Sequence, residues 1–172
     1  MSSDEERDDS RIEIRLATAD DAPSISAVLL QSFIEYKSSY TPEGFAATTP
    51  NADEIKKRMT EGPLWVALLD GEIVGTVSAV LQGESLYVRG MAVLPSGRGH
   101  RIGELLMSRV ESFASAQKCK RLFLSSTPFL SRAIALYERL GFSRTSEGSD
   151  DLGGTPLFTM EKAVKTLGYV QP

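Results

Sequence analysis

The chain has 172 residues, 41% of them hydrophobic and 24% charged, a composition typical of one globular domain with a substantial core. The formal net charge of −4 argues against a broad nucleic-acid surface, and no apolar run is long enough to span a membrane. A single Cys and a single His exclude an internal disulfide framework and a Cys/His metal site. The sequence therefore predicts a cytoplasmic protein without metal, nucleic acid or membrane partner.

The excess negative charge is confined to the N-terminus. Residues 1–10 hold five acids and one Arg, whereas residues 11–172 hold 18 acids and 18 bases. Short, strongly charged segments without apolar residues do not build a core. We expect residues 1–10 to form a disordered acidic tail and residues 11–172 to form a single domain.

The N-terminal third predicts one strand and two helices joined by a long loop. Residues 12–16 alternate apolar and charged side chains as a half-buried strand does, and Thr18 followed by Asp21 is typical of a helix start. Weak periodicity predicts a loop rich in aromatic residues over 34–50, and a capping pattern predicts a short helix over 51–59.

Three strands are expected in the middle of the chain. Residues 64–69 and 73–81 are rich in apolar and β-branched side chains, and the Asp70-Gly71 pair between them is a strong hairpin signal. Residues 86–93 form the next predicted strand. These strands would pack one apolar face of a sheet against helices.

The C-terminal half alternates predicted helices and strands. The expected elements are a helix over 99–117, a strand over 121–126, a helix over 131–140 ended by Gly141, and strands over 142–145 and 157–162 around a loop at 146–155. The order of elements is β-α-α-β-β-β-α-β-α-β-β. This order predicts a mixed α/β domain.

Residues 91–107 are the most informative segment. An apolar strand end, a loop rich in Gly and Arg, and a helix with a clean apolar stripe follow one another without a gap. The start of a helix offers unpaired N–H groups and the positive end of its dipole, which suits a phosphate. Arg98 and Arg101 add positive charge there, and with Arg89 they are expected to form a cluster suited to a small anion.

The run MAVLPSGRGHRIGELLM, followed further along by AIALYERLGF, resembles the GNAT superfamily of acyl-CoA-dependent N-acyltransferases. The resemblance covers almost the entire ordered chain. It implies a mixed, mostly antiparallel seven-stranded sheet with helices on both faces, in which strands 86–93 and 121–126 splay apart. It also implies transfer of an acetyl group from acetyl-CoA to a primary amine of a small molecule or peptide, by direct attack in a ternary complex.

The resemblance implies that the loop and first helical turn bind the CoA diphosphate, and that the end of strand 86–93 pairs with the pantetheine arm. The family pattern of Gln or Arg, two variable residues, Gly, one variable residue and Gly or Ala runs here from Arg98 to Gly103, with Arg101 where Gly is usual. Arg101 could crowd the phosphate or pair with it. The implied cofactor-binding residues are Met91, Ala92, Val93, Arg98, Gly99, His100, Arg101, Ile102, Gly103, Glu104 and Ser126, the last replacing a polar contact usually made by Asn at the position of Leu130.

Tyr137 is the residue that the resemblance implies as the acid that protonates the departing thiolate; alternatively it belongs to the core stripe of its helix. A base must also deprotonate the amine. The segment that holds a Glu in some relatives carries none in this chain, which leaves Glu84 and Glu35 as candidates, acting directly or through a water.

The acceptor site is expected from residues 33–45 and 146–155. Phe33, Tyr36 and Tyr40 would form aromatic walls that, with one or two acids, suit a cationic amine or a peptide N-terminus. The two tyrosines could equally be a helix end packed on the sheet.

Two other functions fit the same sequence. One is a catalytically silent acyl-CoA-binding sensor, favoured by the missing strand Glu and by Arg101. The other is a different nucleotide-phosphate binder that uses the same loop. The GNAT resemblance also allows a homodimer, paired through sheet edges or the C-terminal strand.

Overall fold

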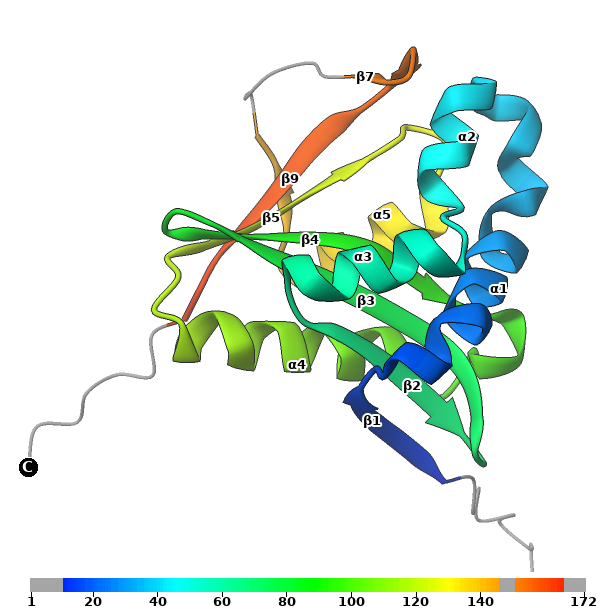
Figure 1. The fold of residues 1–172 in the computed structure, drawn as a ribbon. Helices are drawn as coiled ribbons and strands as arrows, with labels where there is room; N and C mark the ends of the chain where they lie inside the picture. The colour runs from blue at the N-terminus through cyan, green and yellow to red at the C-terminus, as the bar shows by residue number, and fades with distance from the viewer. Residues whose placement is uncertain (1–10, 146–150, 166–172) are drawn as a thin grey trace, which may run out of the picture.

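A sheet with helices on both faces forms the framework of the protein (Figure 1). The computed structural model describes residues 11–145 and 151–165. Its elements are β1 (Ile12–Leu16), η1 (Ala19–Asp21), α1 (Ala22–Phe33), η2 (Ile34–Ser39), α2 (Pro42–Thr48), α3 (Ala52–Glu61), β2 (Leu64–Leu69), β3 (Glu72–Gln82), β4 (Ser85–Val93), η3 (Pro95–Gly97), α4 (Ile102–Ala116), β5 (Arg121–Ser126), α5 (Ser131–Arg139), β6 (Ser143–Arg144), β7 (Asp151–Leu152), β8 (Thr155–Pro156) and β9 (Phe158–Ala163).

The main sheet has the strand order β1-β2-β3-β4-β5-β9-β6 within the described residues. Every neighbouring pair is antiparallel except β4 and β5, which run parallel. The predicted mixed, mostly antiparallel seven-stranded sheet is confirmed. None of the helices in the described part of the chain has the length and apolarity needed to cross a bilayer.

Two apolar layers hold the helices against the sheet. On one face, the fully buried Ile25 of α1 and Ile55 of α3 pack with Val66 of β2. On the other face, Ile102 and Leu106 of α4 belong to a larger cluster that also takes in α5 and the closing strands. Burial of such side chains contributes about 1.5–3 kcal/mol each, so the two layers fix how the helix ends lie against β4.

Strands β4 and β5 separate soon after they begin. They pair only from Ser85–Tyr87 to Arg121–Phe123, although β4 continues to Val93. Beyond this point β4 turns toward α1 and β5 leads to α5 (Figure 1). The predicted splay is confirmed, and it leaves the second half of β4 with one unpaired main-chain edge.

A β-bulge accompanies the separation. Thr76 pairs with Ala92 whereas Ser78 pairs with Arg89, so β4 places two residues opposite one residue of β3. Gly90 lies in this bulge with φ +63, a left-handed conformation that favours glycine. The register therefore identifies Gly90 as part of a β-bulge.

Two predicted turns have the expected geometry. Asp70 and Gly71 connect β2 to β3 with φ values of 50 and 85, as a two-residue hairpin turn requires. Gly141 ends α5 with φ 96, and the N–H of Phe142 donates to the carbonyl of Tyr137 at 2.9 Å. This cap fixes the last turn of the helix that carries Tyr137.

Three predicted boundaries are wrong. The loop expected over 34–50 contains η2 and α2, whose start is capped where the N–H of Gly44 donates to Thr41 Oγ1 at 3.0 Å. The helix expected from 99 begins at Ile102, because Arg101 is left-handed with φ 58. Part of the expected loop 146–155 is the hairpin β7–β8, while residues 1–10, 146–150 and 166–172 lie outside the described residues.

Candidate active site

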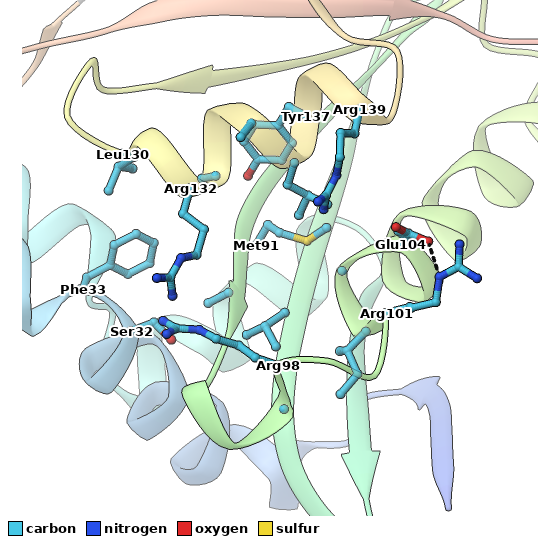
Figure 2. A pocket seen from close by; sticks show the side chains of 18 of the residues that line it. Ser32, Phe33, Met91, Arg98, Arg101, Glu104, Leu130, Arg132, Tyr137 and Arg139 are labelled. Atoms are coloured by element: carbon cyan, nitrogen blue, oxygen red, sulfur yellow. Dashed lines mark hydrogen bonds and ion pairs between the residues drawn. The ribbon is translucent and has the colours of Figure 1, made fainter. Parts of the chain in front are cut away.

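A pocket of about 480 Å³ opens where β4 leaves β5. The start of α4, the end of β4, the C-terminal end of α1 with η2, and one side of α5 surround it. We call it the first pocket; the residues that line it include Phe33, Glu35, Tyr36, Met91, Ala92, Val93, Arg98, Gly99, Arg101, Ile102, Gly103, Glu104, Arg132, Tyr137 and Arg139 (Figure 2).

The N-terminus of α4 presents main-chain donors to the first pocket. The first hydrogen bond of the helix runs from the N–H of Leu105 to the carbonyl of Arg101 at 3.0 Å. The N–H groups of residues 102–104 therefore have no acceptor within the helix, and they lie at the positive end of its dipole. Such an end is suited to a phosphate group.

Arg101 leaves this group of donors accessible. Its main chain adopts the left-handed conformation that glycine usually supplies, with φ 58. Its side chain is 81% exposed, and its Nε donates to Glu104 Oε2 at 3.0 Å. Figure 2 shows this pair directed away from Arg98. The sequence left open whether Arg101 crowds the phosphate or pairs with it. This geometry disfavours crowding.

Two further arginines face the first pocket from α5. Arg132 and Arg139 line it together with Arg98 and Arg101, against the two acids Glu35 and Glu104 among the described lining residues. These two arginines were not among the site residues expected from the sequence. Their spacing of seven places both on one face of a helix, which was a usable signal once the helix was predicted beside the Gly-rich loop.

The free edge of β4 forms another wall of the first pocket. Ala92 and Val93 pair with β3 on one side, while pairing with β5 has already ended at Tyr87. Met91, Ala92 and Val93 all line the pocket. Their unpaired main-chain groups can bond to an extended molecule that carries amides, as a neighbouring strand would.

Tyr137 lies at the junction of two cavities. It is 8% exposed, its ring packs edge-on against Phe142 at 5.9 Å, and its hydroxyl points into the pocket above Met91 (Figure 2). Burial raises the pKa of Tyr137, so the phenol keeps its proton at physiological pH. The group is available as a proton donor, and it belongs to the core cluster as well.

A second pocket of about 320 Å³ adjoins the first on the β5 side. The two share Phe33, Met91, Leu130, Ala133 and Tyr137. The second pocket is also lined by Tyr40, Arg58, Tyr87, Arg89, Gly90, Ser125, Ser126, Thr127 and Leu152. The expected acids are missing from the described part of this lining, and two arginines stand in their place.

The two segments expected to build the acceptor site do meet. Thr41 Oγ1 donates to the carbonyl of Gly153 at 2.6 Å, which joins the start of α2 to the β7–β8 hairpin. Tyr40 is buried, lies edge-on to Phe129 at 4.8 Å, and lines the second pocket. Tyr36 lines the first pocket, and Phe33 lines both. The sequence offered packing or acceptor walls as alternatives for these aromatic residues. Tyr40 does both, because it is buried against Phe129 and also lines the second pocket.

Several predicted site residues lie elsewhere. Glu84 is in the turn between β3 and β4, is 72% exposed and pairs with Lys120 at 3.1 Å, so it reaches neither pocket and is no longer a candidate base. Glu35 lines the first pocket. Ser126 lines the second pocket instead of the first, and His100 lines neither.

The expected cluster of three arginines is also divided. Arg89 lines the second pocket and pairs with Glu61 at 2.6 Å, whereas Arg98 and Arg101 line the first. Side chains alternate along a strand, and the bulge at Gly90 changes their direction once more. The expectation that Arg89 lies with Arg98 and Arg101 rested on nearness in sequence, and it was wrong.

Comparison with known proteins decides the family. The model of the Acetyltransferase (GNAT) family matches residues 29–142. The chain belongs to this family. Because the family and its curated relatives are acetyltransferases, this GNAT protein is an acyltransferase.

Individual relatives agree with this assignment. The chain is 33% identical over 135 residues to the uncharacterized N-acetyltransferase YjgM of Escherichia coli (strain K12), covering 75% of this chain and 80% of that protein. It is 39% identical over 109 residues to the N-acetylaspartate synthetase of Mus musculus, covering 62% of this chain but 36% of that protein. The PaiA N-acetyltransferase of Thermoplasma acidophilum, solved in complex with coenzyme A, shares the fold, with a TM-score of 0.74, 18% identity and coverage of 89% and 99%.

Proposed function

We propose that this GNAT protein transfers an acetyl group from acetyl-CoA to the primary amine of a small molecule or peptide, by direct attack in a ternary complex. One observation carries the proposal: the free N–H groups at the start of α4, the unpaired edge of β4 and the hydroxyl of Tyr137 all open into one continuous pocket. These are donors for a diphosphate, partners for an amide-bearing arm and an acid for a thiolate, in that order along the pocket.

The residues present fit acetyl-CoA. The N–H groups of residues 102–104 and the guanidinium of Arg98 suit the diphosphate, and Arg132 and Arg139 suit the remaining phosphate. A Cβ at Gly103 would come within 2.8 Å of Leu136 Cδ2, so glycine permits α4 and α5 to approach closely at the point where the main chain must be exposed. The relative solved with coenzyme A supports the same ligand.

Each proposed catalytic step is assigned to a group of this chain. Acetyl-CoA supplies an acetyl group activated as a thioester. Glu35 accepts a proton from the amine, directly or through a water, and a main-chain N–H on the free edge of β4 near Ala92 or Val93 polarises the thioester carbonyl. Tyr137 donates its proton to the sulfur that leaves. Holding the amine against the thioester contributes most of the rate enhancement.

An acceptor screen that follows thiol release tests this proposal. Purified protein is mixed with acetyl-CoA and a panel of amines and peptides, and free CoA is measured against a control without acceptor. Amine-dependent, saturable release together with the N-acetylated product is expected. Tight CoA binding without turnover on any amine would favour the silent sensor. Displacement of CoA by ATP or NAD would favour a different nucleotide-phosphate binder.

A further inference from the structure

We infer that the amine acceptor carries a carboxylate, and that Arg58 and Arg89 bind this carboxylate in the second pocket. The inference rests on the proposed acetyl transfer, and it names the chemical class of the substrate. It reverses the expectation of acidic walls for a cationic amine, because the described lining of the second pocket holds two arginines and no acid.

Arg58 is a half-buried cation. Its Nη2 donates to the carbonyl of Ala47 at 3.1 Å, and its Nη1 lies 3.4 Å from the position a Cβ would take at Gly90. Among the described residues no carboxylate forms an ion pair with it, although Glu54 and Glu61 are near enough to act on its charge. Burial lowers the pKa of Arg58, yet a guanidinium stays protonated in proteins.

Arg89 adds a second positive charge with unused hydrogen-bonding capacity. Its Nη2 donates to Glu61 Oε2 at 2.6 Å, but its Nε is buried without a hydrogen-bond partner. The charge of Arg89 also opposes that of Arg58. Two half-buried guanidiniums, of which only Arg89 has an ion-paired carboxylate among the described residues, are costly to hold side by side unless another anion joins them. A carboxylate matches the fork of N–H donors that arginine presents.

The position of the two arginines suits a small acidic amine. Both line a pocket of about 320 Å³, whose boundary with the first pocket is formed by Met91 and Tyr137. An acceptor whose carboxylate meets Arg58 can therefore place its amine beside the proposed acid Tyr137. Tyr40 and Tyr87 line the same pocket.

Matched pairs of substrates test the inference on the unaltered protein. Each α-amino acid or β-amino acid is compared with its own carboxamide, which keeps the amine and removes the negative charge. We expect kcat/KM to favour the acids by about tenfold to a hundredfold, the value of hydrogen bonds to a charged group. Equal values, or a preference for the carboxamides, would overturn the acidic-acceptor assignment while leaving acetyl transfer intact.

Calorimetry on the CoA complex separates this inference from the proposed function. The same acids and carboxamides are titrated without turnover. Tighter binding of the acids supports the carboxylate site even when no amine is acetylated, an outcome that would refute acetyl transfer alone. Binding that does not distinguish the two sets refutes the site.

Arginine variants identify the groups responsible. Arg58→Gln and Arg89→Gln should raise KM for the acids by about tenfold or more and leave KM for the carboxamides unchanged. Arg58→Lys should recover part of the loss. Arg109→Gln is the matched control, because Arg109 is exposed on α4 and lines neither pocket. Equal losses on acids and carboxamides would show that the arginines serve packing only.

Discussion

Tyr137 combines a structural and a proposed chemical role in one side chain. Its ring packs in the core cluster, while its hydroxyl faces the junction of the two pockets. Tyr137→Phe keeps the ring and removes only the proton, so we expect kcat to fall by about a hundredfold with CoA affinity unchanged. Because burial raises the pKa of Tyr137, its proton remains bound in alkaline solution, and the loss should be constant from about pH 7 to pH 9. Full activity in the variant would remove the proposed acid.

Gly103 tests the close approach of α4 and α5. A single methyl at this position meets only the movable end of the Leu136 side chain, at 2.8 Å. Gly103→Ala should therefore change the Kd for CoA little, whereas Gly103→Leu should raise it about tenfold or more by displacing Leu136 into the pocket. Isothermal titration measures both. Equal affinity in the Leu variant would mean that this turn of α4 does not contact the ligand.

Site residues could be predicted from the sequence where the pattern of neighbouring residues is enough to place them. Apart from His100, the residues from Arg98 to Gly103 line the first pocket, and so does Tyr137. They could be located because a strand-loop-helix transition and a helical stripe are properties of neighbouring residues. Arg58 and Arg89 could not be paired in this way, since α3 and β4 are brought together only by the packed sheet. Glu84 was misplaced for the converse reason, because a hairpin turn carries it away from the pockets.

At the scale of elements, the bulge in β4 is the feature that shapes both pockets. Gly90→Ala forces a side chain into a left-handed conformation with φ +63, at a cost of about 1–2 kcal/mol, and its Cβ would lie against Arg58. Gly83→Ala is the control, because Gly83 has φ +60 in an open turn. We expect both variants to lose similar stability in urea unfolding, and only Gly90→Ala to lose activity. Equal activity in the Gly90→Ala and Gly83→Ala variants would show that the bulge does not contribute to the site.

The start of α1 gives a pH-dependent prediction. Asp21 accepts from Arg15 at 2.7 Å and from the N–H of Thr18 at 2.7 Å, and the Arg15 hydrogen bond is the main cause that lowers the pKa of Asp21 to about 2. A lowered carboxyl pKa stabilises the folded state above the unfolded value of 3.8, and this stabilisation is lost as pH falls toward 2. Asp21→Asn removes this linked contribution and should cost about 1–2 kcal/mol at neutral pH.

Urea unfolding at several pH values checks this contribution. The difference between Asp21→Asn and the unaltered protein should shrink between about pH 4 and pH 2, as Asp21 becomes protonated. A difference that stays constant over that interval would show that the ion pair and cap contribute no linked stability.

Element boundaries were predictable where capping and periodicity agree, as at the Asp70-Gly71 hairpin and the Gly141 cap. The helix α2 was missed because it is short and its apolar periodicity is weak, although Thr41 and Pro42 form a regular helix start. The hairpin β7–β8 depends on contacts with α2, such as the hydrogen bond from the N–H of Thr41 to Thr155 Oγ1 at 2.9 Å. Contacts between residues this far apart in the sequence cannot be predicted from the pattern of neighbouring residues.

For the whole molecule, the divergence of β4 from β5 explains why two pockets meet at one tyrosine. The separation exposes the edge of β4 to the first pocket, and the bulge directs Arg89 into the second. The start of α4 then faces the same opening as the last turn of α5. We propose that this opening holds the diphosphate of acetyl-CoA.

A crystal structure of the protein with acetyl-CoA would show whether the coenzyme lies there. We expect the diphosphate against the N–H groups of residues 102–104 and beside Arg98, with the pantetheine arm along β4 and the thioester next to Tyr137. A coenzyme bound elsewhere on the protein, or a first pocket filled by the chain's own side chains in the complex, would contradict it.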